Sequence, residues 1–243
     1  MMMRTCLAVA VIGAAILPRA GQDAQATLPT IDEILQKNID AIGGRAAMTK
    51  ITTVTARGTI SVPDAGVDGT IQLFQKAPDK ALTIVDLGGM QQREGVDGVI
   101  GWSNDPQNGL REKTGVELAV AKRGAVFARE LRMKELYPKM VVKGREKLGT
   151  SEAYVVEATP TEGSPDTLYY DVTSGLVVRQ LVTRQSAIGP LEVDIALEDY
   201  RAVDGVKRPF RIRQVTTQFT AVVQLTEVTH NTPIDDSMFR KPK

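Results

Sequence analysis

The sequence predicts a mainly β protein of the α+β class, in which two amphipathic helical regions accompany one antiparallel sheet. Apolar and polar residues alternate with a period of two over most of the chain after Lys50, which is typical of strands with one face toward water. Apolar spacing typical of helices occurs in only two regions, one after Thr30 and one after Thr114. Turn-forming residues separate the alternating segments, which favours hairpin connections.

The first 26 residues have the layout of a secretory signal peptide. Arg4 is followed by an apolar stretch from Leu7 to Leu17 and by "AQA" at positions 24–26, an A-x-A cleavage pattern. The apolar stretch is shorter than the roughly 20 residues that span a membrane. We therefore expect a cleavable signal peptide at 1–26, one domain at 27–243 and a periplasmic location.

The balance of basic and acidic residues in 27–243 indicates which classes of binding partner to expect. The whole chain has 30 basic and 29 acidic residues, and removing Arg4, Arg19 and Asp23 leaves 28 of each. A neutral chain without a basic cluster is not typical of a nucleic-acid or anionic-membrane binder, so we expect neither partner. The only cysteine, Cys6, lies in the predicted signal peptide, so a disulfide is not expected.

The first helix is predicted after Thr30, in "TIDEILQKNIDAIGGRAAM". Thr30 and Glu33 have the spacing of a capping box, and Gly43-Gly44 is a typical helix stop. The apolar stripe of this helix consists of Ile31, Ile34, Leu35, Ile39 and Ile42.

Strands are predicted from position 51 to 105. The hairpin turn Val96-Asp97-Gly98 joins the last two of them. The segments before that turn are "ITTVTARGTISV" (51–62), "GTIQLFQKA" (69–77), "ALTIVDLG" (81–88) and the strand that begins at "QQREG" (91–95).

A second helix is predicted over 116–137. Thr114 and Glu117 have the spacing of another capping box, Gly124 is a point at which the helix can divide, and Pro138 ends it. The residues from 139 to 231 then return to the period of two and predict a long antiparallel run, and "IDDSMF" (234–239) predicts one helical turn. About eleven strands are expected in total.

No pattern for catalysis or metal binding stands out. The only histidine, His230, has no G-x-S-x-G nucleophile motif to accompany it, and the ordinary interpretation is a strand-end histidine that is exposed or bonded to backbone. A zinc site needs several Cys or His ligands, and "SNDPQNG" and "PIDDS" lack the order of a calcium loop. Paired carboxylates for glycoside chemistry stay open, although solvated strand faces explain the acidic residues more simply. We predict no catalytic residue, no metal and no cofactor.

The residues that could contact an apolar ligand are large apolar side chains, and ordinary core packing is the alternative for each of them. Trp102 lies at a strand end beside turn residues, where it could form a rim or close the core. The candidates are Phe74, Trp102, Val126, Phe127, Leu131, Val193, Ile195 and Leu197.

Several segments together resemble one bacterial family. They are "GVDGVIGWSNDP", "ELYPKM", "AYVVEATPTEGSPD", "LYYDVTSGLVVRQ" and "LTEVTHNTPIDDSMF". With the order helix, strands, helix and long meander, they resemble the outer-membrane lipoprotein-sorting proteins (LolA/LolB-like), over almost the whole chain from Thr30 to Phe239. The carrier arginine of that family cannot be placed on Arg45 or Arg93 by motif.

The resemblance implies a strongly curved, open antiparallel half-barrel whose concave face is covered by helices, with an apolar cavity between them for acyl chains. It also implies a monomeric, non-enzymatic periplasmic carrier or chaperone for acyl chains of lipoproteins or lipids, with an envelope protein as a further partner. The alternative is an envelope interaction or sensing module with a filled core, and a secreted hydrolase is a third possibility.

Overall fold

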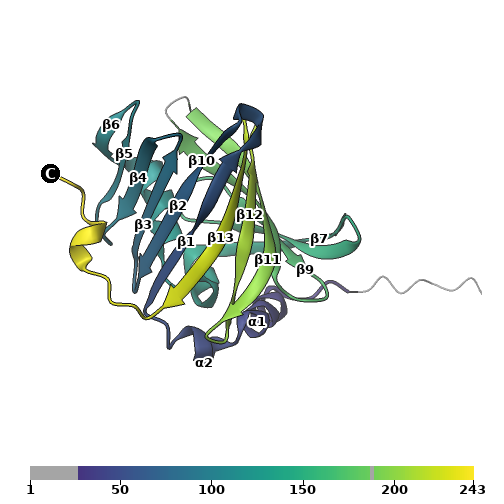
Figure 1. The fold of residues 1–243 in the computed structure, drawn as a ribbon. Coiled ribbons are helices and arrows are strands. Elements are labelled where there is room, and N and C mark those ends of the chain that lie inside the picture. The colour runs from purple at the N-terminus through teal and green to yellow at the C-terminus, as the bar shows by residue number, and fades with distance from the viewer. Residues whose placement is uncertain (1–26, 187–188) are drawn as a thin grey trace, which may run out of the picture.

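The computed structural model describes residues 27–186 and 189–243, so the predicted signal peptide lies outside the described residues. The described chain forms one antiparallel sheet of thirteen strands, whose two edges are β6 and β7. Figure 1 shows that the sheet curves strongly and stays open, as a half-barrel does. The strands are β1 (Thr53–Val62), β2 (Val67–Lys76), β3 (Lys80–Leu87), β4 (Met90–Val96), β5 (Gly101–Asp105), β6 (Gly109–Glu112), β7 (Lys139–Leu148), β8 (Ser151–Thr159), β9 (Asp166–Asp171), β10 (Val177–Ser186), β11 (Gly189–Val203), β12 (Val206–Val215) and β13 (Thr220–His230).

The order of the strands explains how a meander becomes a half-barrel. The order is β6-β5-β4-β3-β2-β1-β13-β12-β11-β10-β9-β8-β7, so each strand pairs with its sequence neighbour except where β1 meets β13. That one long-range pairing joins the N-terminal and C-terminal runs into a single sheet. The predicted class is confirmed, with more strands than the eleven or so expected. The sequence analysis assigned no strand to the short edge strand β6.

Helix α1 (Ile31–Ile42) forms as predicted. The Thr30 hydroxyl accepts a hydrogen bond from the Glu33 amide at 3.3 Å, and the Glu33 carboxylate accepts one from the Thr30 amide at 2.7 Å. Gly43 ends the helix with φ of 137°, and the short helix α2 (Arg45–Met48) follows. The buried side of α1 packs against β7, β12 and the segment near residue 130 (Figure 1).

The second helix, predicted over 116–137 with a possible division at Gly124, is divided. The chain forms α3 (Gly115–Ala125), the 3₁₀ turn η2 (Arg129–Arg132) and the single turn α4 (Met133–Leu136) instead. The helix ends where Val126 turns extended with ψ of 120°, and Ala128 then takes a left-handed conformation with φ of 47°. The amide of Phe127 donates to the carbonyl of Pro78 at 2.9 Å, which ties this break to the β2–β3 turn.

The predicted second capping box is wrong. Thr114 makes no side-chain capping bond at the start of α3. Glu117 instead accepts two hydrogen bonds of 2.7 Å from the guanidinium of Arg111 and lies 3.3 Å from the Lys113 ammonium. These charged partners come from the strand β6 and the residue just after it, so the tertiary ion pair replaces the local cap.

Helix α3 crosses the concave face. It contacts β4 and β5 on one side of the half-barrel and β10 on the other. The helical segments and the concave face of the sheet therefore enclose the interior of the molecule between them.

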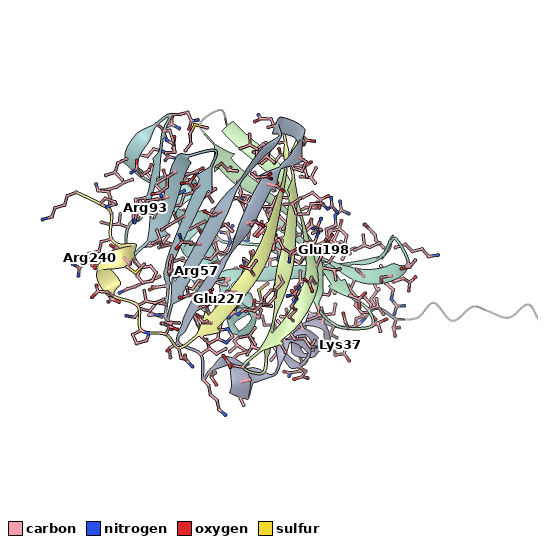
Figure 2. The ribbon with its side chains drawn as sticks, in the orientation of Figure 1. Lys37, Arg57, Arg93, Glu198, Glu227 and Arg240 are labelled. Carbon is pink, nitrogen blue, oxygen red and sulfur yellow. The ribbon has the colours of Figure 1, made fainter. Side chains whose placement is uncertain are left out.

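The outer face of the sheet is polar over β1 and β13 and apolar at one end. Figure 2 shows Arg57 and Glu227 on this outer face, where they occupy paired positions of β1 and β13. Toward β3, β4 and β5 the outer face is covered by the C-terminal 3₁₀ turn η3 (Asp236–Phe239), the helical turn predicted for 234–239 (Figure 1). Among the described residues, none of the helices has the length and apolar character of a membrane span.

Candidate functional site

A cavity of about 190 Å³ lies between the concave face and the segment that links α3 to α4. Its walls come from α1 and α2, from the break at 126–130, and from strands β9 to β12. The apolar residues of its lining are Ile42, Met48, Ile51, Val126, Phe127, Ala128, Met133, Leu168, Val177, Leu197, Val206 and Pro209. The polar residues are Asn38, Gln75, Arg129, Glu130, Tyr170, Gln180, Tyr200, Lys207 and Arg208.

Three of the eight candidate residues line this cavity, namely Val126, Phe127 and Leu197. Leu131 is half-buried against the main core cluster beside the cavity. Val193 and Ile195 are buried at alternate positions of β11, on the same face of the strand as Leu197. Leu197 of β11 and two candidates of the linking segment therefore lie around one space, whereas Val193 and Ile195 are buried outside its lining.

Phe74 and Trp102 lie elsewhere. Cross-strand pairing connects Phe74 to Leu82, Leu82 to Gly95 and Gly95 to Trp102, which places these side chains on one face of the sheet. That face is the outer one, because Trp102 is fully buried against the C-terminal turn and its indole Nε1 donates to the carbonyl of Phe239 at 2.8 Å. The two aromatic residues close an outer core cluster and are not brought to the cavity.

Arg208 is the polar residue of the cavity whose surroundings are most unusual. Strand β12 alternates so that Val206, Phe210 and Ile212 join the main core cluster, and Arg208 lies in the same series. Its Nε donates to Nε2 of His230 at 3.2 Å. Burial lowers the pKa of the Arg208 guanidinium, although the charge of Glu130 opposes that shift.

His230 is almost completely buried, with 1% of its side chain exposed. Its Nδ1 lies 3.1 Å from Oδ2 of Asp204. Burial, and then the charge of Arg208, lower the pKa of the imidazole, while Asp204 acts in the opposite direction. A neutral ring that donates from Nδ1 to Asp204 and accepts at Nε2 from Arg208 satisfies both contacts. The histidine predicted as an ordinary strand end is therefore part of a side-chain relay.

A second arginine lines the cavity from the linking segment. Nη2 of Arg129 donates to the hydroxyl of Tyr137 at 2.9 Å, and that hydroxyl donates to Oδ2 of Asp166 at 2.5 Å. Burial raises the pKa of the Tyr137 phenol. This chain of bonds attaches the linking segment to β9. Tyr170, also in the lining, is buried, and burial raises the pKa of its phenol as well.

None of these polar residues was predicted as a site residue, because the predicted ligand contacts were all large apolar side chains. A signal was present in "VKRPFRIRQV", where an arginine occupies the position between Val206 and Phe210 on the inward series. Alternation alone predicts an apolar residue there. The sequence signal for Arg129 was weaker, because the helix predicted over 116–137 did not indicate that the Arg129 side chain faces the cavity.

A larger groove of about 400 Å³ lies on the other side of the linking segment, and Val126 borders both spaces. Its lining includes Asp79, Lys122, Arg123, Arg132, Glu135 and Glu162. A groove lined by so many charges is a poor place for an apolar ligand, since burying these charges is costly. We take the smaller cavity as the candidate site.

Comparison with solved structures supports the fold of this protein. No family model matches the chain, and no curated protein matches it. Solved structures do match. A LolA superfamily protein from Nitrosomonas europaea has a TM-score of 0.58 and 17% identity, covering 88% of this chain and 99% of that one. A domain described as an outer-membrane lipoprotein-sorting protein from Vibrio parahaemolyticus has a TM-score of 0.60 and 14% identity, with 86% and 95% covered.

A DUF1329 family protein from Desulfovibrio piger is similar to the same degree, with a TM-score of 0.59, 12% identity, and 86% and 97% covered. The protein therefore shares its open half-barrel fold with these solved structures, at identities that show the fold alone. Within the described residues, no group of His, Cys, Asp and Glu side chains is arranged to hold a metal ion.

Proposed function

We propose that this protein is a non-enzymatic periplasmic carrier that binds the acyl chains of lipoproteins or lipids. The observation that carries the proposal is the cavity between the concave face and the linking segment, in which a cluster of apolar side chains lies beside polar ones. The fold, shared with structures described as LolA superfamily and lipoprotein-sorting proteins, supports it. Burial of each methylene contributes about 0.8 kcal/mol, so a chain can bind tightly through apolar contact alone.

The size of the cavity limits what the closed form can hold. An engineered apolar cavity of about 150 Å³ accepts benzene, whereas typical ligand pockets measure about 300–1,000 Å³. A cavity of about 190 Å³ therefore has room for part of one chain. Binding of a whole acyl chain requires the linking segment to move outward, and Val126, which separates the cavity from the outer groove, is the side chain whose displacement would enlarge it.

The test uses an uncharged fluorescent probe, a pyrene-labelled long-chain alcohol, and delipidated protein. We expect saturable binding by the wild type. Leu197→Trp should lower the affinity about tenfold or more, because the larger ring fills the cavity. Val99→Trp, at a side chain that is 73% exposed, is the matched control and should bind as the wild type does. Circular dichroism checks that both variants keep their strands.

Two results would contradict the carrier. Wild-type protein without saturable probe binding would indicate the module with a filled core. Equal loss of binding in the Leu197 and Val99 variants would place the probe outside the cavity.

A further inference from the structure

We infer that the cavity selects chains that end in an anionic head group, a carboxylate or a phosphate, and that Arg208 binds this group. The inference rests on the proposed function, because it requires a chain in the cavity, and it adds the chemical class of that chain. Its basis is the hydrogen-bonding state of Arg208, the relay behind it and the charge of the lining.

Arg208 presents unused donors to the cavity. A guanidinium has five N–H donors, and only the Nε–H is bonded to another residue of the described chain, namely to His230. No carboxylate among the described residues lies within ion-pair distance of it. On the outer face of the same strand, by contrast, Arg211 forms an ion pair with Glu198 at 3.0 Å. The inward arginine is thus a partly buried cation whose two Nη groups have no acceptor among residues 27–186 and 189–243.

The relay fixes the direction of those donors. Asp204 holds the His230 ring through Nδ1, and the ring then presents Nε2 as an acceptor to Arg208. Because Nε is bonded from behind, the two Nη groups form the free edge of the guanidinium. That edge has the fork geometry that binds a carboxylate or a phosphate with two parallel hydrogen bonds.

The charge of the lining points the same way. The charged residues of the lining are Arg129, Lys207, Arg208 and Glu130. Lys207 is exposed and alternates with the inward residues of β12, so the inward charges are the two arginines and one carboxylate, an excess of one positive charge. Arg129 is bonded to the Tyr137 hydroxyl and, like Arg208, has no carboxylate within ion-pair distance in the described chain. Unpaired buried cations are costly, and an anionic head group would relieve that cost while its chain occupies the apolar part.

Glu130 allows a second test of the inference, in which binding of an anion should become stronger and not weaker. Burial lowers the pKa of Arg208 and the charge of Glu130 opposes this shift, and the same charge contributes to the raised pKa of Arg129, so Glu130 acts on the region where the head group would bind. It is not in an ion pair with either of them within the described residues. If the site accepts an anion, Glu130 repels it, and Glu130→Gln should strengthen the binding of anionic chains.

The experiment compares three ligands of equal chain length: a fatty acid, the corresponding fatty alcohol and the corresponding alkyl phosphate. Each displaces the pyrene-labelled alcohol from delipidated full-length protein. We expect the wild type to bind one or both anions at least tenfold more tightly than the alcohol. The ligand with the larger preference identifies carboxylate or phosphate as the natural head group.

Arg208→Gln should lose that preference, with about a tenfold or greater fall in affinity for the anions and little change for the alcohol, because hydrogen bonds to charged groups contribute about 1.5–3 kcal/mol. Arg211→Gln, an outward arginine on the same strand, is the control and should retain it. Glu130→Gln should raise the affinity for the anions several-fold, and it keeps the inference testable if the Arg208 variant does not fold.

The outcomes separate the two proposals. Binding of the alcohol without any preference for the anions, or an equal loss of all three ligands in Arg208→Gln, overturns the head-group inference and leaves the carrier intact. Absence of binding for all three ligands overturns both.

Discussion

At the scale of single residues, burial determines which protonation state His230 favours. It is the only histidine of the chain, it ends β13, and it is buried between an arginine and an aspartate. Protonation would place a second positive charge beside Arg208 in a buried position. Because the pKa of the folded imidazole is lowered from its ordinary 6.5, the folded state favours the neutral ring.

This lowered pKa predicts a pH dependence of stability. As the pH falls below about 6.5, the unfolded chain binds a proton that the folded chain does not, so the free energy of unfolding decreases, by at most about 1.4 kcal/mol per pH unit. Urea unfolding between pH 6.5 and 5.5 should show this slope in the wild type. His230→Gln, which keeps an acceptor for Arg208, should flatten it. Equal slopes in the two proteins would show that His230 takes up its proton in the folded state as easily as in the unfolded one.

At the scale of elements, the tight turn between β9 and β10 is the support on which α1 lies. Gly175 has a positive φ of 75°, a conformation that tight hairpin turns commonly require and that glycine adopts without steric cost. Nζ of Lys37 donates to the carbonyl of Val172 at 2.6 Å, and the buried amide of Asn38 donates to the carbonyl of Gly175 at 2.8 Å. Figure 2 shows Lys37 on α1 at this end of the sheet. Side chains of the helix therefore bond to backbone carbonyls of the turn, and the two elements lie so close that Gly175 has no space for a side chain.

A pair of glycine substitutions measures this contact. A Cβ at Gly175 would lie 2.7 Å from Cγ and 3.0 Å from the carbonyl oxygen of Lys37, whereas a Cβ at Gly149, with φ of 63°, meets nothing within 4 Å. Both alanine variants pay about 1–2 kcal/mol for the left-handed conformation. We expect Gly175→Ala to lower the free energy of unfolding by about 1 kcal/mol more than Gly149→Ala, since helix and turn must separate. Identical urea midpoints would mean that α1 adjusts without cost.

At the scale of the whole molecule, the C-terminal segment acts as a second cover, on the side of the sheet opposite the cavity. Phe239 is fully buried with Trp102, Leu82 and Phe74. Asp236 lies 2.7 Å from the ammonium of Lys76 and 2.5 Å from that of Lys80, and hydrogen bonds from these two lysines lower its pKa to about 2. The last residues of the chain thus complete a core that begins at β2.

Removal of this cover should be visible in the fluorescence of Trp102, the only tryptophan. Phe239→Ala should reduce the free energy of unfolding by about 3–5 kcal/mol, the range for a fully buried phenylalanine, and should shift the Trp102 emission to longer wavelength. Phe219→Ala, at a side chain that is 39% exposed, is the control and should change neither quantity appreciably. A Phe239 variant as stable as the control would show that the C-terminal turn does not contribute to the core.

The local features of the fold could be predicted because each depends on residues close together in the sequence. The capping box of Thr30 and Glu33, the stop at Gly43 and the positive φ of Gly175 are all short-range effects of backbone and side-chain chemistry. The capping box at Thr114 failed although the partners that replace it are also close in the sequence. Glu117 pairs with Lys113 and Arg111, two charged partners that are stronger than one backbone amide, and the short strand β6 that positions Arg111 was not predicted.

The sequence by itself determined the mainly β class, the first helix, most of the strands and the alternation that divides each strand into two faces. Only the tertiary structure decided which face of the sheet is concave. Alternation predicts that Phe74 and Leu197 each lie on an apolar face of a strand, but it does not predict that the C-terminal turn covers Phe74 and that Leu197 faces the cavity. The tertiary structure also decided that Arg208, His230 and Asp204 meet. Arg208 and His230 lie on the neighbouring strands β12 and β13, and Asp204 lies just before β12. Their contact depends on the register of this strand pair and on the directions of the side chains, which strand periodicity does not encode.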